Sequence, residues 1–398
     1  MVGAGHLGRG VDADDRRWSP VTSNRVGLDT LGRAATLSET CERVKPRLLD
    51  WLQCPWCGGT FSVEPFPGSD PADIDEGLLR CSCGRVFPIV RGIPRILADA
   101  FALHGDFVAR HRDRLPASMP QPDSSEPHAD AIRSTRESFG YQWTRFSEMV
   151  VDFRENFLQY ISPVDERFFP GKLGLDLGCG FGRHIYNAAR FGAEMVGVDI
   201  SEAIESTRIN TQGMSNVHLV QADVYHLPFR PGVFDFAYSI GVLHHLPEPE
   251  TAFQRVVSLV RPGGSVFIWV YSNSRRFLNF ALESVRAVTT RSPKPVQQCL
   301  SFVGAAIDWS VFIAPYRLAS RVPALGAVAR RIGPARLKVY AEYPFQVVYA
   351  DWFDRLAAPI RFYYDDRAMR GWLERAHLGR TTISPTGLFG WRAYGERT

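Results

Sequence analysis

The chain has 398 residues, of which 45% are hydrophobic, a length that suggests two or three folded units and a composition typical of globular proteins. Its formal net charge of +4 is too small to indicate nucleic-acid binding by itself. Between Ser272 and Lys338, however, eleven basic and two acidic residues give a charge of +9, which leaves −5 for the rest. The basic character is therefore concentrated in one segment.

Residues 1–45 are rich in Gly, Arg and Ser and show no steady hydrophobic period, so we predict a disordered N-terminal segment. Aspartates between positions 12 and 15 and the lack of an apolar core argue against a signal or transit peptide. The longest apolar stretch, 296–316, is interrupted by Asp308 and Pro315 and falls short of an uncharged membrane span. We therefore expect a cytoplasmic protein.

Residues 46–98 contain two close cysteine pairs, Cys54 with Cys57 and Cys81 with Cys83. Paired cysteines at this spacing indicate metal binding in a reducing compartment rather than a disulfide framework. Four thiolates suit tetrahedral zinc. The second pair has one intervening residue instead of the usual two, so packing without metal is the alternative.

The same block ends in Phe87-Pro-Ile-Val-Arg-Gly-Ile-Pro94. With the cysteines, this ending is similar to that of small zinc-ribbon proteins that partner tRNA and protein methyltransferases. The resemblance implies a zinc-ribbon-like domain over 46–98 with a structural zinc. Because such a ribbon has a small core, metal would supply much of its stability.

Four prolines and several acidic and serine residues between 99 and 130 predict a linker. A helical, aromatic block follows, Phe139-Gly-Tyr-Gln-Trp-Thr-Arg-Phe146.

From Gly171 to Tyr271 the pattern alternates between strand and helix, which predicts right-handed crossovers and a mainly parallel sheet. The predicted strands are 173–177, 194–198, 217–221, 234–239 and 265–271, with helices at 183–191 and 249–260. We predict a Rossmann-like, doubly wound α/β domain over 131–398. A basic helical insertion at 272–350 follows the fifth strand, and a helix at 365–377 with strands near 381–384 and 390–394 closes the domain.

The first strand leads into Asp176-Leu-Gly178-Cys179-Gly180-Phe-Gly182, and Asp199 ends the next strand. Glycines allow a tight turn and a close approach of a ligand to the backbone, and the carboxylate of Asp199 can accept both hydroxyls of a ribose. A dinucleotide-binding enzyme would share these features. Asp176, however, would repel a pyrophosphate and can hold the cationic amino-acid end of a ligand.

Residues 171–271 resemble the class I S-adenosylmethionine-dependent methyltransferases, specifically the methyltransferase type 11 group. Five blocks carry the likeness: 171–182, 196–201, 221–229, 234–246 and Arg261-Pro-Gly-Gly264.

The resemblance implies that S-adenosylmethionine binds at the carboxyl ends of the strands. Gly178, Gly180 and Gly182 would line its methionine and ribose parts, with Cys179 as a packing residue in the same loop. Asp199 would bind the ribose hydroxyls, Ile200 would pack on the adenine, and Asp223 would accept from the adenine amino group beside Val224. Ser239 and Ile240 would face the methyl group that is transferred.

Similar methyltransferases carry a helical lid before the first strand, which implies a cofactor role for the aromatic block. Tyr141 would donate a hydrogen bond to the cofactor and Arg145 would bind its carboxylate. The alternative is a core helix with Trp143 and Phe146 buried.

Methyl transfer needs a general base only where the acceptor must lose a proton, and His245 is the candidate. Its alternative role is to order the loop after the fourth strand. The favoured acceptor is a small molecule (a natural product, a glycan or a lipid-linked compound). RNA methylation and a non-catalytic binding module are the alternatives. The basic insertion indicates an anionic acceptor or contact with a membrane surface, and an ordinary helical cap with a solvated basic face is the alternative.

Overall fold

The computed structural model describes residues 46–68, 74–116, 127–387 and 389–398. The segment predicted to be disordered, 1–45, lies outside the described residues, as do 117–126 of the predicted linker.

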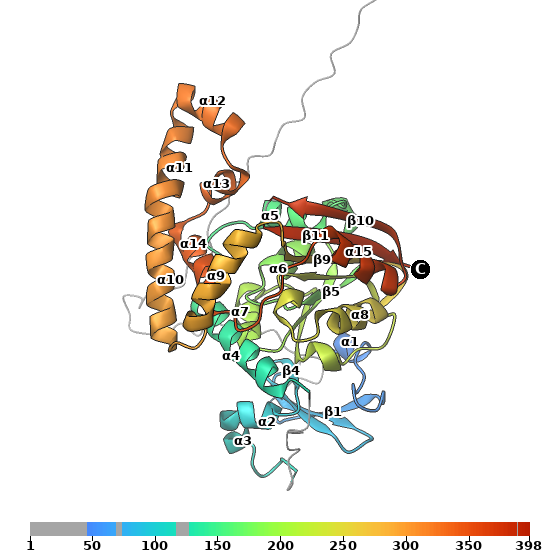
Figure 1. The fold of residues 1–398 in the computed structure, drawn as a ribbon. Helices are drawn as coiled ribbons and strands as arrows, with labels where there is room; N and C mark the ends of the chain where they lie inside the picture. The colour runs from blue at the N-terminus through green and yellow to red at the C-terminus, as the bar shows by residue number, and fades with distance from the viewer. Residues whose placement is uncertain (1–45, 69–73, 117–126, 388) are drawn as a thin grey trace, which may run out of the picture. The chain divides into compact units, whose positions relative to one another are not determined.

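A sheet with strand order β1-β2-β3-β4-β7-β6-β5-β8-β9-β11-β10 runs through the described part of the chain (Figure 1). The strands from β4 to β9 in this order pair in parallel, and β11 and β10 close the edge antiparallel. This confirms the predicted α/β fold with a mainly parallel sheet. The strands are β5 (Leu173–Leu177), β6 (Glu194–Asp199), β7 (Val217–Ala222), β8 (Phe234–Ile240), β9 (Val260–Tyr271), β10 (Leu378–Thr386) and β11 (Gly390–Arg397).

Helices cover both faces of this sheet because successive strand residues point to opposite sides. In β6, Val196 and Val198 pack with one core that includes α8 and α15, whereas Met195 packs with a second core that includes α5, α6 and α7. The helices are α4 (Ala129–Arg145), α5 (Arg154–Ile161), α6 (Arg183–Arg190), α7 (Ala203–Asn210), α8 (Pro249–Leu259) and α15 (Asp366–Arg375), with the short turns η1 (Glu166–Phe168), η2 (Val224–His226) and η3 (Leu243–His245).

The N-terminal ribbon extends the central sheet. Its elements are α1 (Pro46–Leu49), β1 (Phe61–Pro65), β2 (Gly77–Cys81), β3 (Val86–Val90) and β4 (Ile93–Ile96). β4 pairs in parallel with β7, Arg95 opposite Gln221 and Ile96 opposite Ala222. Ribbon side chains such as Phe87 and Ile89 share a core with the strands of the main domain. The ribbon is therefore built into the fold through both hydrogen bonds and apolar packing.

Part of the predicted linker is ordered structure. Helices α2 (Ala100–Leu103) and α3 (Gly105–Arg110) follow β4 directly. Phe101 and Phe107 are buried against the ribbon residues Phe66 and Leu78. These helices are held by the packing of two aromatic side chains against the ribbon. That packing is a tertiary contact, so the composition of the segment did not reveal the helices.

The insertion after β9 is helical, as predicted, and consists of α9 (Arg276–Thr289), α10 (Lys294–Asp308), η4 (Trp309–Ile313), α11 (Ala314–Arg321), α12 (Pro323–Ile332), α13 (Ala335–Tyr340) and α14 (Phe345–Ala357). α10, η4 and α11 form one continuous helix, seen as a long rod in Figure 1. By length and composition, this helix, Lys294–Arg321, could cross a membrane.

Asp308 and Pro315 interrupt the apolar sequence of this segment but not its helix, which is continuous. Asp308 is buried and pairs with Arg336 and the indole of Trp352, so its charge is compensated. Pro315 follows the wider turn of η4, where the missing backbone donor is tolerated.

Candidate active site

A cavity of 1250 Å³ lies between the carboxyl ends of the parallel strands and the helical insertion. This position follows from the fold, because the loops that leave the strands of a doubly wound sheet form a crevice at that edge. Nine of the residues predicted to form the site line the cavity: Gly178, Cys179, Gly180, Asp199, Ile200, Asp223, Val224, Ile240 and His245.

The glycine-rich loop between β5 and α6 requires its glycines for steric reasons. Gly178, Gly180 and Gly182 all have positive φ angles, of 78°, 56° and 92°. A Cβ on Gly178 would lie 2.3 Å from Val242, and one on Gly182 would lie 3.1 Å from Thr207. The positive φ angles at both positions, together with the 2.3 Å approach at Gly178, make glycine strongly preferred there.

Asp199 stands at the end of β6 with its carboxylate held in place by three donors. The backbone N–H of Gly180 donates to Oδ2 at 2.9 Å, and the N–H and hydroxyl of Ser201 donate to Oδ1 at 2.8 and 2.6 Å. A carboxylate offers about four acceptor positions, so capacity remains for a hydroxyl from the cavity. Burial raises the pKa of Asp199 despite these donors.

Three predicted site residues lie behind the cavity wall. Asp176 is buried within the sheet, and burial raises its pKa to about 8, so it does not present the negative charge that we had expected to hold a cationic group. Ser239 donates to the carbonyl of Leu177, while its neighbour Ile240 lines the cavity. Gly182 packs against α7. In this structure these three residues shape the loop and the strand ends behind the cavity, and contact of any of them with a ligand stays a prediction.

Helix α4 covers the cavity, but with a different face from the one predicted. Phe139 and Trp143 line the cavity, whereas Tyr141 packs against Phe353 and Arg145 is exposed to solvent. Residues four apart lie on one helical face, and residues two apart lie on different faces. The direct roles assigned to Tyr141 and Arg145 are therefore not supported, although the helix itself lies where the lid was expected.

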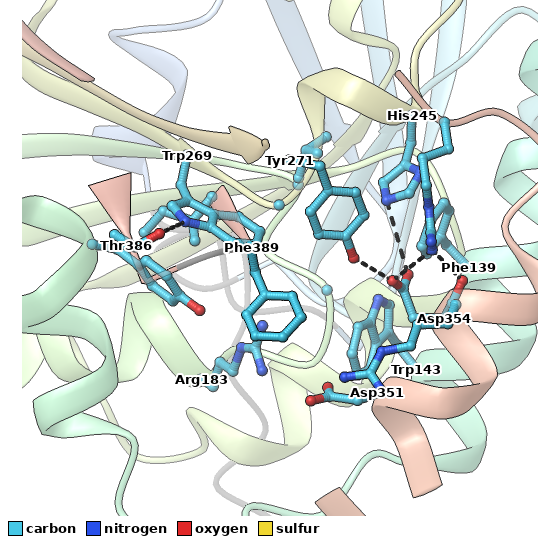
Figure 2. Close-up of a pocket in the computed structure, with 18 of the residues that line it drawn as sticks. Phe139, Trp143, Arg183, His245, Trp269, Tyr271, Asp351, Asp354, Thr386 and Phe389 are labelled. Carbon is cyan, nitrogen blue, oxygen red and sulfur yellow. Dashed lines mark hydrogen bonds and ion pairs between the residues drawn. The ribbon is translucent and has the colours of Figure 1, made fainter. Parts of the chain in front are cut away.

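Arg183 is a cationic side chain at the site that the sequence analysis did not identify. It is the first residue of α6, and it lines the cavity, where Figure 2 labels it. Its guanidinium lies 5.5 to 5.8 Å from the ring centroids of Trp143, Phe153 and Phe181. Its place directly after the last glycine of the loop was the available signal, because the N-terminus of this helix faces the ligand edge of the sheet.

His245 belongs to a polar cluster at the insertion side of the cavity. Its Nδ1 lies 2.7 Å from the carbonyl oxygen of Ile360, and its Nε2 lies 3.9 Å from Oδ1 of Asp354. Figure 2 shows that Tyr271 reaches the same carboxylate, and its hydroxyl donates to Asp354 at 2.5 Å. The guanidinium of Arg361 also contacts Asp354, at 3.2 Å.

The surroundings of this cluster set its charges. Burial lowers the pKa of His245 to about 4, although Asp354 acts in the opposite direction. Burial alone would raise the pKa of Asp354, but Arg361 and His245 hold it below its ordinary value. At neutral pH the cluster therefore combines a neutral imidazole with an ionised carboxylate. Asp354 and Arg361 escaped the sequence analysis because more than 100 residues separate them from His245.

The four ribbon cysteines form a second candidate site, away from the cavity. Their Sγ atoms all lie within 4.8 Å of one another, with Cys54 and Cys83 at 3.9 Å and Cys57 and Cys81 at 3.3 Å. Thiolates bound to zinc at 2.3 Å in a tetrahedron would be about 3.8 Å apart. The short spacing between Cys81 and Cys83 thus allows all four sulfurs to converge on one point.

Two known families match the parts of the chain that contain these two candidate sites. Residues 175–268 match the family described as methyltransferase domain, and residues 45–92 match the family described as Trm112p-like protein. The chain contains a methyltransferase domain.

Curated relatives match this chain over part of its length. The ubiquinone biosynthesis O-methyltransferase of Pectobacterium carotovorum (strain PC1) is 29% identical over 152 residues, 37% of this chain and 63% of the relative. That of Acinetobacter baumannii (strain ACICU) is 27% identical over 175 residues, 42% and 70% of the two chains. The chain thus spans less than two thirds of the length of the first relative.

Among solved structures, human N-acetylserotonin methyltransferase in complex with S-adenosylmethionine matches 68% of this chain and 60% of its own. The sequence identity is 13% and the TM-score is 0.40.

Proposed function

We propose that the chain is an S-adenosylmethionine-dependent methyltransferase that acts on a small-molecule acceptor held in the cavity beneath the helical insertion. The observation that carries the proposal is the meeting of two sets of groups in one cavity. The glycine loop, Asp199 and Asp223 lie on the sheet side, and the cluster of His245 and Asp354 lies on the insertion side. A volume of 1250 Å³ exceeds that of most single-ligand pockets, about 300–1,000 Å³, and suits a cofactor and an acceptor together.

The residues on the sheet side fit S-adenosylmethionine. Asp199 retains acceptor capacity for the ribose hydroxyls, and Ile200 and Val224 provide apolar surface for the adenine beside the carboxylate of Asp223. Arg183 replaces Arg145 as the cation that can bind the cofactor carboxylate. The cofactor supplies an already activated methyl group, so the protein mainly aligns the partners and excludes water.

His245 is the group best placed to take a proton from an acceptor hydroxyl. If Nδ1–H donates to Ile360, Nε2 is left without a proton and can accept one. Asp354 lies close enough to stabilise the imidazolium that results. The two curated relatives are named as O-methyltransferases, which supports an oxygen acceptor. A structural zinc held by Cys54, Cys57, Cys81 and Cys83 completes the proposal.

The cofactor site is tested by calorimetric titration with S-adenosylmethionine and S-adenosylhomocysteine. Asp199→Asn should weaken binding about 10-fold or more, because a hydrogen bond to a charged group is lost. Asp235→Asn is the matched control. Asp235 lies near the amino end of β8, at the edge of the sheet opposite the cavity, and its carboxylate accepts a hydrogen bond from the backbone N–H of Leu173. No binding to a folded wild-type protein would overturn the proposal.

The role of His245 is tested by methyl transfer from labelled cofactor to a panel of phenolic acceptors. His245→Gln should lower kcat about 100- to 10,000-fold, while cofactor affinity stays unchanged. Asp354→Asn should give a smaller loss with an altered pH profile. Unchanged kcat in His245→Gln would restrict this residue to ordering its loop.

A further inference from the structure

The outer surface of the insertion is apolar, whereas that of an ordinary solvent-exposed helical cap is polar. Of the 22 large hydrophobic side chains that are exposed in the described part of the chain, 18 lie between Phe277 and Val339. Such a concentration is not the scattered exposure found on ordinary soluble surfaces, and it marks an interaction site.

The long helix formed by α10, η4 and α11 shows this inversion clearly. Exposed side chains recur every three or four residues and form one apolar stripe, Val296, Leu300, Val303, Ile307 and Val311, and Leu318 is exposed seven residues farther along. The opposite face of α10, which packs toward α14, buries Gln297, Ser301 and Asp308. Apart from Ala305 and Ile313, which are buried, the helix thus places its polar groups inside the protein and most of its large apolar groups outside.

Helix α9 repeats the same arrangement. Its buried residues are Arg286 and Thr289, which donate hydrogen bonds to backbone carbonyls near the end of α14. Phe277 and Phe280 are 94% and 75% exposed. Two consecutive helices with the same inversion indicate an outer surface adapted to an apolar environment.

Charge distinguishes the partner that this surface fits. Its exposed basic residues are Arg276, Arg291, Arg321, Arg331 and Lys338. The two acidic residues of this segment are occupied, Glu283 with Arg286 and Asp308 with Arg336. Apolar stripes bordered by uncompensated cations match the interface of a bilayer that contains anionic lipids.

The apolar surface is also continuous with the cavity. Leu278, Ile307 and Phe312 line the cavity and are nevertheless 50%, 56% and 53% exposed. An acceptor with an apolar chain can therefore pass from a membrane into the cavity along hydrophobic surface, with its polar end directed toward His245.

We infer that residues 276–339 of the insertion dock on the surface of a membrane with anionic lipids. We also infer that the acceptor is an amphiphile, a polar group carrying an apolar chain. The inference about the acceptor rests on the proposed methyltransferase activity. The inference about membrane docking does not depend on that activity. Because α9 and α10 each hold one face against the protein, these two helices lie in the interface and do not cross the bilayer.

Docking is tested by flotation of the full chain with vesicles of phosphatidylcholine, alone or mixed with phosphatidylglycerol. The wild type should bind the mixed vesicles, and V296S/L300S/V303S should bind about 10-fold less or weaker still. Ile209→Ser is the control, because Ile209 is 60% exposed on α7 and should not affect binding. Arg321→Gln with Arg331→Gln should reduce the preference for anionic vesicles.

The outcomes separate the two proposals. Absence of wild-type binding to either vesicle overturns docking, as does binding that the triple variant retains in full. A wild-type dimer that the triple variant converts to monomer, without vesicle binding, assigns the surface to self-association instead. Cofactor titration of the same variants reports on the methyltransferase site independently. Faster transfer to short soluble acceptors than to their long-chain analogues, in the presence of vesicles, would overturn the acceptor class.

Discussion

The ribbon and the insertion are both additions to the same sheet, but the ribbon buries apolar side chains whereas the insertion exposes many of its own to solvent. The ribbon buries Phe87, Ile89 and Ile96 in a core shared with the main domain. The insertion buries Gln297 and Asp308 and exposes its larger apolar side chains. The difference indicates that the ribbon stabilises the fold, and it supports the proposal that the insertion docks on a membrane.

The contact between the ribbon and the main domain also includes a buried ion pair. Arg95 is fully buried and contacts Glu205 of α7, Gln221 of β7 and the carbonyl of Val90. Arg91 binds the same carboxylate at 2.8 Å but is half exposed. Because Arg95 and Arg91 bind the same glutamate but differ in burial, the two arginines allow the effect of a buried charge to be compared with that of an exposed charge.

Zinc removal should have the largest effect. Free zinc ten thousand times above its Kd would contribute about 5.5 kcal/mol to folding, so a chelator should lower the unfolding free energy by a similar amount. Cys57→Ser should lose the metal, whereas Cys299→Ser should keep it, although both cysteines are exposed. Metal analysis combined with thermal unfolding measures both. A wild type purified without metal yet fully stable would contradict the prediction.

Arg95→Leu should destabilise the protein by about 3 to 5 kcal/mol, because Glu205 would lose its buried partner. Arg91→Ala should cost about 1 kcal/mol or less, since that side chain is solvated. Denaturant unfolding compares the two variants. The double variant Arg95→Leu/Glu205→Leu should recover much of the loss, and a double variant as unstable as the single one would argue against a role for the charge.

Two aliphatic truncations address the comparison directly. Ile89→Ala in the ribbon should cost about 2 to 5 kcal/mol, because the side chain is fully buried. Leu300→Ala in the insertion should change stability by only about 0.5 kcal/mol. Equal costs in denaturant unfolding would mean that the outer face of α10 is covered in solution.

The pH dependence of stability gives a further test of the same buried ion pair. Burial alone would raise the pKa of Glu205, but Arg95 and Arg91 outweigh it and hold the pKa at about 2. The unfolded chain takes up a proton near the ordinary value of 4.5. The stabilisation is therefore complete above that value and is lost as the pH falls toward 2.

Unfolding measured at several pH values should show this loss in the wild type. The slope should be smaller in Glu205→Gln, which has no carboxyl group to titrate. An identical slope in both proteins would assign the acid sensitivity to other groups.

The success of the sequence analysis differed between parts of the site. The glycine loop and Asp199 were predictable because their positions depend on a local strand, turn and helix. The roles of Tyr141 and Arg145 were not, since Phe139 and Trp143 occupy the face of α4 that reaches the cavity. A residue's place in a block does not specify the direction of its side chain.

By itself, the sequence determined the alternation of strands and helices, the ligand edge of the sheet, the cysteine set and the basic helical insertion. These properties depend on short-range periodicity and steric needs. Only the tertiary structure decided that β4 joins β7, that Asp354 lies beside His245, and that the insertion turns its apolar stripes outward. An apolar stripe on a helix predicts burial against something, and the packing of the whole chain decides whether that partner lies inside the protein.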